Sequence, residues 1–379
     1  MRTRACALLG MEFPIFAFSH CRDVVAAVSK AGGFGVLGAV AYSPEHLKIA
    51  LDWIDEHVGD RPYGVDVIVP AKYVGDDAGG LTASEAVDLI PEEHRRFVDE
   101  ILEKYHVPGL PESGGGGGDR RMPFSRESTK ELLEVVWRHP KVKFIANALG
   151  PAPDYLVEEA HERGLVVGGL VGKVEHARRQ KEAGVDMIIA QGYEAGGHTG
   201  EIATMVLVPQ VVDAVAPVPV LAAGGIADGR QVAAALALGA EGVWCGSVWL
   251  TTDEAETHPV VKEKFLQATS ADTIRSRAKT GKPARQLRSA WTDEWEDPAN
   301  PKPLPMPLQG ALVAEAELRI ARSAASNDGA RELINYFIGQ AVGQMNKPKS
   351  AGQVVLDMVE EYIDAATRLG STLDETNSL

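Results

Sequence analysis

The sequence has few cysteines, fewer basic than acidic residues, and no long apolar run. Only three of its 379 residues are cysteine and none forms a CxxC pair, which excludes a disulfide-rich scaffold and gives no support for a metal site. No stretch reaches the roughly 18 apolar residues of a membrane span, and the first residues, MRTRACALLGMEFPIF, lack the pattern of a signal peptide. We therefore expect a cytoplasmic protein without a membrane span or a bound metal.

The acidic excess restricts the class of ligand. The chain carries 53 acidic and 38 basic side chains, a formal net charge of −15. Nucleic acid binding depends on clustered lysines and arginines, so nucleic acid is not expected as the main partner. Because 45% of the residues are hydrophobic, the chain can build a full core. We expect a globular protein that acts on small molecules, with room for a local amide-lined pocket for an anion.

Short apolar runs alternate with segments of helical periodicity along the chain. Because these runs have no polar face, they predict a parallel sheet covered by helices. Eight runs favour a closed (β/α)8 TIM barrel over an open doubly wound sheet, whose glycine fingerprint is missing after the first run. The runs are residues 14–18, 34–38, 63–69, 142–149, 165–171, 185–191, 218–224 and 241–247.

Two regions interrupt this repeat. Residues 71–127 contain five consecutive glycines, Gly114 to Gly118, and are expected to form an insertion after the third strand. Residues 251–379 include the Pro-rich segment PANPKPLPMPLQ and end in an amphipathic helix. We expect residues 1–250 to form the barrel and residues 251–379 a helical extension or lid packed on it. Both regions are candidate walls of the functional site.

The segment VDMIIAQGYEAGGHTG, residues 185–200, carries the main catalytic candidate. An apolar strand ending at Gln191 leads into a loop in which Gly196 and Gly197 allow backbone N–H groups to approach an anion closely. His198 follows at the carboxyl side of the strand, where the catalytic groups of a TIM barrel gather. Its ordinary pKa lies near neutrality, so it could exchange a proton or, when protonated, stabilise an anion.

Two later strands also end in glycine. Gly224 and Gly225 close the seventh run just before a helix, which places free N–H groups at a positive helix end. The eighth run ends in Gly246 and Ser247. Because strands seven and eight of a barrel are the usual place for a phosphate, the pattern predicts a phosphate-bearing cofactor.

Other polar residues near strand ends have open roles. His20 could touch substrate or cofactor, and Asp66 within an apolar strand needs a polar partner. Lys173 could reach a phosphate or could equally be a surface lysine, and Glu194 could act as a base or brace its loop. Core packing is expected for the Cys245 side chain and for the tryptophans Trp244, Trp249, Trp291 and Trp295.

Taken together, the runs AQGYEAGGHTG, TMVLVPQVVDAV and PVLAAGGIADGRQVAAALALGAEGVWCGS resemble the nitronate monooxygenase family, formerly called 2-nitropropane dioxygenases. The resemblance covers most of residues 10–290 and implies an FMN-dependent TIM-barrel enzyme with His198 as the catalytic histidine. It implies that Gln191 and Gly196 contact FMN, and that Asp66 replaces a flavin-bonding Asn of the family. The residues implied to hold the FMN phosphate end through backbone amides are Gly225, Trp244, Cys245, Gly246 and Ser247.

The resemblance implies oxidation of alkyl nitronates by O₂ to a carbonyl compound and nitrite. The neutral nitroalkane would require His198 to remove a proton first. Related flavin barrels leave an alternative open, namely NAD(P)H-dependent reduction of a quinone or of an enoyl thioester. A flavin-binding protein without turnover is a third interpretation. We consider a homodimer as the assembly.

Overall fold

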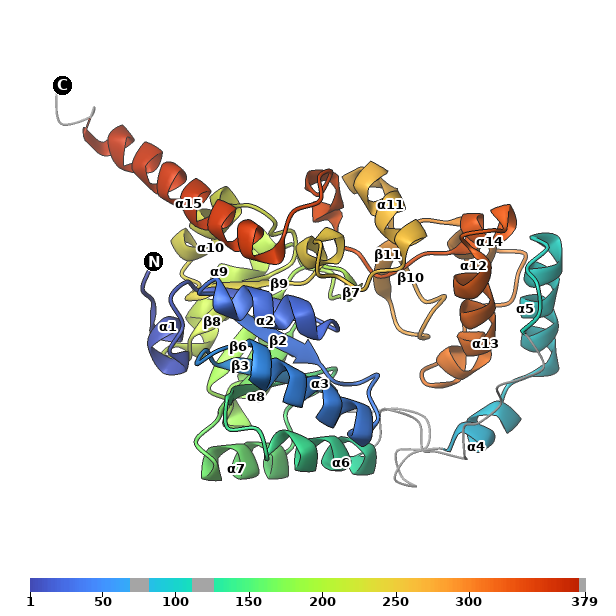
Figure 1. Cartoon of the computed structure of the whole chain (residues 1–379), viewed down its shortest axis with the longest axis horizontal. Coiled ribbons are helices and arrows are strands. Elements are labelled where there is room, and N and C mark those ends of the chain that lie inside the picture. Colours follow the sequence, from blue (N-terminus) through green and yellow to red (C-terminus); the bar gives the residue numbers. More distant parts are fainter. Residues whose placement is uncertain (69–81, 111–125, 375–379) are drawn as a thin grey trace.

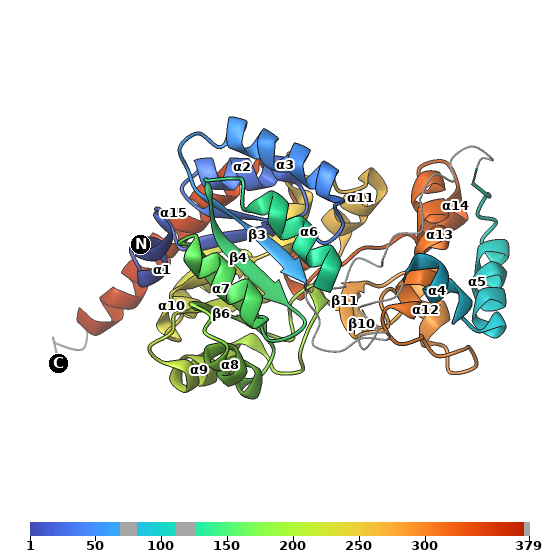
Figure 2. The ribbon, with the colours of Figure 1, turned by 90° about the horizontal axis from the view of Figure 1, so that it is seen from below.

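The computed structural model describes residues 1–68, 82–110 and 126–374. Eight parallel strands close into a barrel, with every neighbouring pair hydrogen-bonded and β9 paired back to β1 (Figures 1 and 2). All eight predicted runs are barrel strands, so the predicted TIM barrel is confirmed. The strands are β1 (Ile15–Ser19), β2 (Phe34–Gly38), β3 (Tyr63–Ile68), β4 (Val142–Ala148), β5 (Val166–Val171), β6 (Met187–Gln191), β8 (Val220–Ala223) and β9 (Gly242–Cys245).

The barrel interior is filled by aromatic side chains from alternate positions of the strands. The ring centroid of Phe16 lies 5.3 Å from that of Phe34, 6.0 Å from Phe144 and 6.2 Å from Trp244. Helix α1 (Arg4–Leu9) packs against this inner cluster through Ala5, Cys6 and Leu9. Because these side chains fill the lower barrel, a ligand site inside the barrel is expected at its carboxyl mouth.

The outer layer follows the helices that the sequence predicts. Pro44 begins α3, and the hydroxyl of Ser43 accepts a hydrogen bond from the His46 N–H as its cap. A reciprocal cap of Asp228 and Gln231 begins α10. The layer comprises α2 (Arg22–Lys30), α3 (Pro44–His57), α6 (Arg126–Val136), α7 (Asp154–Glu162), α8 (Val174–Glu182), α9 (Thr204–Val215) and α10 (Gly229–Ala237).

The last helix, α15 (Ala351–Asp374), takes the place of the eighth barrel helix. It packs between α10 and α2, and Val355 and Met358 lie in the main core (Figure 1). A Cβ atom at Gly229 would lie 2.3 Å from the Met358 carbonyl oxygen, so only glycine allows this close approach. A long segment of the chain therefore lies between β9 and α15, the helix that completes the barrel.

Most of that segment forms a second hydrophobic cluster, here called the cap, with buried residues between Val260 and Met345. Residues between Phe97 and Val107 also belong to this cluster. Helices α4 (Ala83–Asp88) and α5 (Glu92–Lys104) from the predicted insertion pack against α13 (Leu308–Ser323) of this cap (Figure 2). The other helices and strands of the cap are α11 (Pro259–Gln267), β10 (Thr273–Ser276), β11 (Ala284–Leu287), α12 (Ala290–Glu296) and α14 (Asp328–Leu333).

The predicted domain division at residue 250 stays a prediction. The predicted insertion, residues 71–127, is described only over residues 82–110 and from Arg126 onward. The glycine run Gly114 to Gly118 lies outside the described residues. Among the described helices, none is long and apolar enough to cross a membrane.

Candidate active site

His198 lies on a short strand, β7 (Gly197–His198), that follows the carboxyl end of β6. This strand pairs antiparallel with β11, with His198 opposite Ala284 and Gly197 opposite Arg285. The histidine therefore stands between the barrel and the cap, fixed by backbone hydrogen bonds of a small three-stranded sheet. The sequence places it correctly beyond β6 but does not predict this sheet.

The cap provides the groups that set the protonation of His198. The Nε2 atom of His198 lies 2.8 Å from the Thr280 hydroxyl oxygen. Burial, with a further contribution from the positive charge of Lys282, lowers the pKa of His198 to about 4. The imidazole is therefore neutral at neutral pH, and Lys282, rather than a protonated histidine, supplies positive charge here.

The loop that carries His198 is held by contacts to the cap. The buried guanidinium of Arg285 donates from Nε and Nη2 to the Tyr193 carbonyl oxygen, at 3.1 and 3.0 Å. The Gln340 N–H donates to the Glu194 carbonyl oxygen at 2.9 Å. A Cβ at Gly196 would lie 2.8 Å from the Gly339 nitrogen, so this glycine allows two backbones to meet.

Glu194 braces the same loop against the barrel. Its carboxylate accepts hydrogen bonds from the Thr204 N–H and hydroxyl, both at 2.9 Å. The Thr204 hydroxyl also lies 3.0 Å from the Gly224 carbonyl oxygen. Because its carboxylate is engaged in this way, Glu194 serves as a structural link between the ends of β6 and β8 rather than as a free base.

A pocket of about 440 Å³ opens beside the glycine pair after β8. Gly224 and Gly225 have φ values of 97° and 74°, the left-handed region that favours glycine. Their side of the pocket is completed by Glu194 and Thr204 from the barrel and by Gln340 from the cap. A Cβ at Gly246, after β9, would meet nothing nearer than the Phe18 ring at 3.7 Å, so this strand end is open.

Asp66 lies inside the barrel near its mouth. It is paired in register with Gly38 of β2 and Ala146 of β4 and is only 3% exposed. Its Oδ2 atom has no hydrogen-bond partner, and burial raises the pKa of this carboxyl well above its usual value. A neutral carboxyl group with an unsatisfied oxygen therefore faces the interior.

Comparison with known proteins assigns the chain to a family. A family model described as nitronate monooxygenase matches residues 3–361. This chain belongs to the nitronate monooxygenase family. It is 61% identical over 370 residues to a Mycobacterium tuberculosis (strain ATCC 25618 / H37Rv) protein named as a candidate monooxygenase, covering 97% of this chain and 98% of that protein. It is 32% identical to a "probable nitronate monooxygenase" of Staphylococcus saprophyticus, covering 83% and 88% of the two chains.

Two solved structures share the architecture over almost the whole chain. FabK from Thermotoga maritima superposes with a TM-score of 0.73 at 30% identity, covering 98% of this chain and 99% of FabK. Nitroalkane oxidase from Streptomyces ansochromogenes superposes with a TM-score of 0.78 at 26% identity, covering 96% and 99%. This member of the nitronate monooxygenase family is a flavin-dependent oxidoreductase.

The barrel mouth fits a flavin. The unsatisfied oxygen of Asp66 offers a hydrogen-bonding group to a heterocycle at the mouth, and the Trp244 ring, stacked on Phe18 with centroids 5.9 Å apart, gives an apolar floor. The open glycine at residue 246 leaves room for a phosphate end. The role of each predicted cofactor-binding residue stays a proposal.

Two of the predicted phosphate-site residues have side chains engaged elsewhere. The Cys245 thiol lies in the core between strands and helices, and burial raises its pKa to about 12. The Ser247 hydroxyl accepts a hydrogen bond from the Gly339 N–H of the cap at 2.8 Å. Only backbone groups of Cys245 remain available to a phosphate, as the resemblance implies.

The other residues that the sequence singled out lie in different surroundings. Nδ1 of His20 lies 3.0 Å from the Gly38 carbonyl oxygen, beside the strand position of Asp66, and burial lowers the pKa of His20. Lys173 is exposed at the start of α8 (Val174–Glu182). The tryptophan side chains lie in hydrophobic clusters, with Trp249 in the main core and Trp291 and Trp295 in the cap.

The sequence patterns missed the cap residues Thr280, Lys282 and Arg285. The only signal for them is a pair of short runs, 273–276 and 284–287, that flank Gly281-Lys282-Pro283, a pattern typical of a β-hairpin. Nothing in that pattern indicates that the hairpin touches His198, which is distant in sequence.

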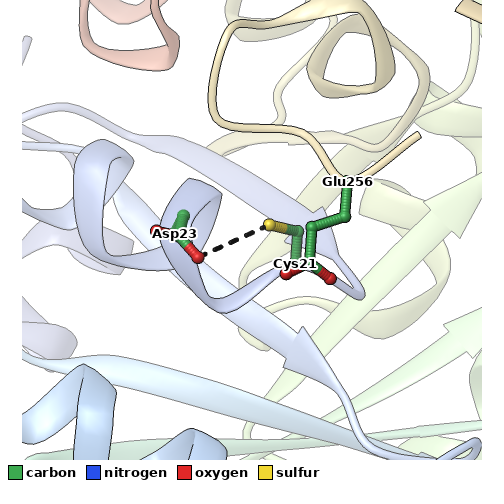
Figure 3. A group of neighbouring side chains, drawn as sticks. All are labelled: Cys21, Asp23 and Glu256. Carbon is green, nitrogen blue, oxygen red and sulfur yellow. Dashed lines mark hydrogen bonds between the residues drawn. The ribbon is translucent and has the colours of Figure 1, made fainter. Parts of the chain in front are cut away.

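A cluster outside this site joins Cys21, Asp23 and Glu256, with ligand-type atoms within 4.8 Å of one another (Figure 3). The Cys21 thiol donates to the Glu254 carbonyl oxygen at 3.0 Å, and burial raises its pKa. To bind a metal, the Cys21 thiol would have to lose its proton, and its raised pKa opposes that loss. We interpret the cluster as a structural contact that holds the start of α2 against the segment that follows β9.

Proposed function

We propose that this enzyme binds FMN and oxidises alkyl nitronates with O₂ to a carbonyl compound and nitrite. The observation that carries the proposal is the placement of a neutral imidazole, His198, beside the positive charge of Lys282 and above a barrel mouth that fits a flavin. Nitronates are anions, so a fixed cation beside a neutral base suits them as substrates.

The residues proposed to hold FMN surround the mouth. Asp66 and Gln191 would contact the ring, and the backbone of the glycine loops would bind the phosphate. When bound, FMN would supply the electron transfer between substrate and O₂. The complete proposed set is Asp66, Gln191, Gly196, Gly197, Gly224, Gly225, Trp244, Cys245, Gly246 and Ser247.

His198 and Lys282 divide the remaining tasks. A nitronate arrives already deprotonated, and the Lys282 ammonium would attract its negative charge. A neutral nitroalkane must first lose its α-proton, which the neutral His198 imidazole can accept. Because the cap covers His198, the proton transfer would occur away from bulk water.

A second candidate is NAD(P)H-dependent reduction of an enoyl thioester or a quinone. The 30% identity to FabK over 98% of this chain supports a related flavoenzyme of this kind. In that case Lys282 would bind a phosphate or a developing enolate instead of a nitronate. The two candidates therefore share a site and differ in substrate.

A substrate panel on the purified flavoprotein separates them. Oxygen uptake and nitrite release with propionate 3-nitronate would support the proposal, with catalase present to remove any H₂O₂ formed. NADH consumption with crotonyl thioester or a quinone, and no nitrite, would replace it with the second candidate. The extracted flavin is identified by chromatography against FMN and FAD. The cytoplasmic location and the homodimer stay predictions.

A further inference from the structure

Thr280 contacts His198 but belongs to none of the glycine loops discussed above. It lies between β10 and β11 in the cap, and its hydroxyl oxygen is 2.8 Å from Nε2 of His198. Among the residues that the structure describes, no group forms a hydrogen bond with the other ring nitrogen, Nδ1. The two nitrogens of the imidazole therefore have different surroundings.

The turn that carries Thr280 is held in place. Gly281 has φ of 81° and its N–H donates to the Arg277 carbonyl oxygen at 2.9 Å. A Cβ on Gly281 would lie 2.2 Å from the Leu304 carbonyl oxygen, so another backbone segment packs directly against the turn. The backbone that carries the Thr280 hydroxyl is thus held in place by the cap.

The hydrogen bonds of the hydroxyl limit where protons can lie. The Lys282 N–H donates to the Thr280 oxygen at 3.3 Å, and the hydroxyl can donate to the Lys282 carbonyl oxygen, also at 3.3 Å. If the hydroxyl proton is used for that carbonyl, its oxygen accepts from Nε2–H of His198. Nδ1 is then the unprotonated nitrogen, the form that a base requires.

We propose that Thr280 is a positioning residue that holds His198 as the Nε2–H tautomer and so leaves Nδ1 as the base facing the substrate. For the substrate, this inference rests on the proposed function. In the step itself, the Cα–H bond of a nitroalkane breaks, the proton forms an N–H bond on Nδ1, and the electron pair moves into the C=N bond of the nitronate. The Thr280 oxygen, accepting from Nε2–H, stabilises the imidazolium formed.

Nitrogen NMR on the flavin-loaded enzyme with ¹⁵N-labelled histidine tests the tautomer directly. His198→Asn identifies the signals of His198 by their loss. We expect an unprotonated Nδ1 and a protonated Nε2 in the wild type and in Thr280→Ser, and a mixture of tautomers in Thr280→Val, which keeps the shape but lacks the hydroxyl. An unprotonated Nε2 in the wild type would overturn the proposal, whether or not any variant folds.

Kinetics with a matched pair of substrates give the second test. With nitroethane, which needs a base, Thr280→Val should lower kcat about tenfold with little change in KM. With ethyl nitronate, already deprotonated, the loss should stay below about threefold, and Thr280→Ser should restore both. Equal losses on both substrates, or none, would contradict the role. If the wild type turns over neither substrate, the proposed function fails, while the NMR result still decides the role of Thr280.

Discussion

The guanidinium of Arg285 lies 4.3 Å above the ring of Tyr193 and donates two hydrogen bonds to the backbone carbonyl oxygen of the same residue. A third donor, Nη1, reaches the Thr273 hydroxyl at 3.1 Å. One cap side chain therefore joins β10, β11 and the loop that carries His198. The loop that carries His198 is therefore attached to the cap as well as to the barrel.

Replacing Arg285 by methionine should destabilise the protein and disorder that loop. The change keeps an apolar stem but leaves the Tyr193 carbonyl oxygen without its donor, which should lower the free energy of unfolding by about 2–4 kcal/mol. Urea unfolding and kcat measure the two effects. Arg288→Met is the matched control, because Arg288 is exposed and its pair with Asp293 should be worth less than about 1 kcal/mol. Equal losses in both variants would contradict the role of Arg285 in holding the loop.

Replacing His198 by asparagine should keep the flavin but remove most turnover. The side chain contacts the Thr280 hydroxyl and is not needed for the glycine loops, so flavin content should match the wild type. Loss of a general base lowers the rate on nitroalkane by roughly 10²–10⁴-fold. His161→Asn is the control, since His161 is 42% exposed on the outer helix α7. Wild-type rates in His198→Asn would rule out the catalytic role.

Replacing Lys282 by methionine should weaken the binding of anions and raise the pKa of His198. The positive charge of Lys282 contributes to the lowering of that pKa to about 4, so its removal lets the histidine bind a proton at higher pH. Activity on nitroethane, which needs the neutral imidazole, should fall with decreasing pH through about 4 in the wild type and at a higher pH in the variant. KM for propionate 3-nitronate should rise about tenfold. Lys282→Arg keeps the charge and should show neither change.

Replacing Asp66 by asparagine should stabilise the protein at neutral pH. Burial raises the pKa of Asp66 in the folded state, so the folded protein keeps a proton that the unfolded chain releases above about pH 4. Stability is therefore lost as the pH rises above that value, and the amide removes this loss. The urea midpoint of Asp66→Asn should exceed that of the wild type by more at pH 8 than at pH 5.

A control with the opposite sign accompanies this experiment. Asp52 is exposed, and its hydrogen bond from Lys48 lowers the pKa of the carboxyl. Its contribution is present at neutral pH and disappears as the pH falls through the folded pKa. Asp52→Asn should therefore be slightly less stable than the wild type at pH 8. A pH-independent effect of Asp66→Asn would show that the carboxyl is not held protonated.

The barrel could be predicted because its signal is local. Each strand is a short apolar run, each helix begins or ends at a cap such as Ser43 or Asp228, and eight repeats admit few closed arrangements. The position of His198 beyond β6 follows from the same rule, since catalytic groups of the fold gather at strand ends. These inferences need only neighbouring residues and the period of the pattern.

The cap contributions could not be predicted because they depend on contacts between distant segments. Thr280 and Lys282 reach His198 only through the pairing of β7 with β11, and a two-residue strand leaves no periodic pattern. For the same reason, the sequence left open whether His198 exchanges a proton or stabilises an anion when protonated, whereas burial under the cap makes it neutral. Nor does the glycine at position 196 by itself distinguish an anion contact from its close approach to Gly339.

The packing of α15 between α10 and α2 affects the order in which the chain can fold. One apolar flank of α2, the first helix of the outer layer, is covered only when α15, the last helix of the chain, packs against it. During synthesis, the eight barrel strands can pair while this flank of α2 is still uncovered, and the cap is made before α15. A ribosome-bound chain that ends before Ala351 should therefore be sensitive to proteases along α2, and protection should appear only when α15 emerges.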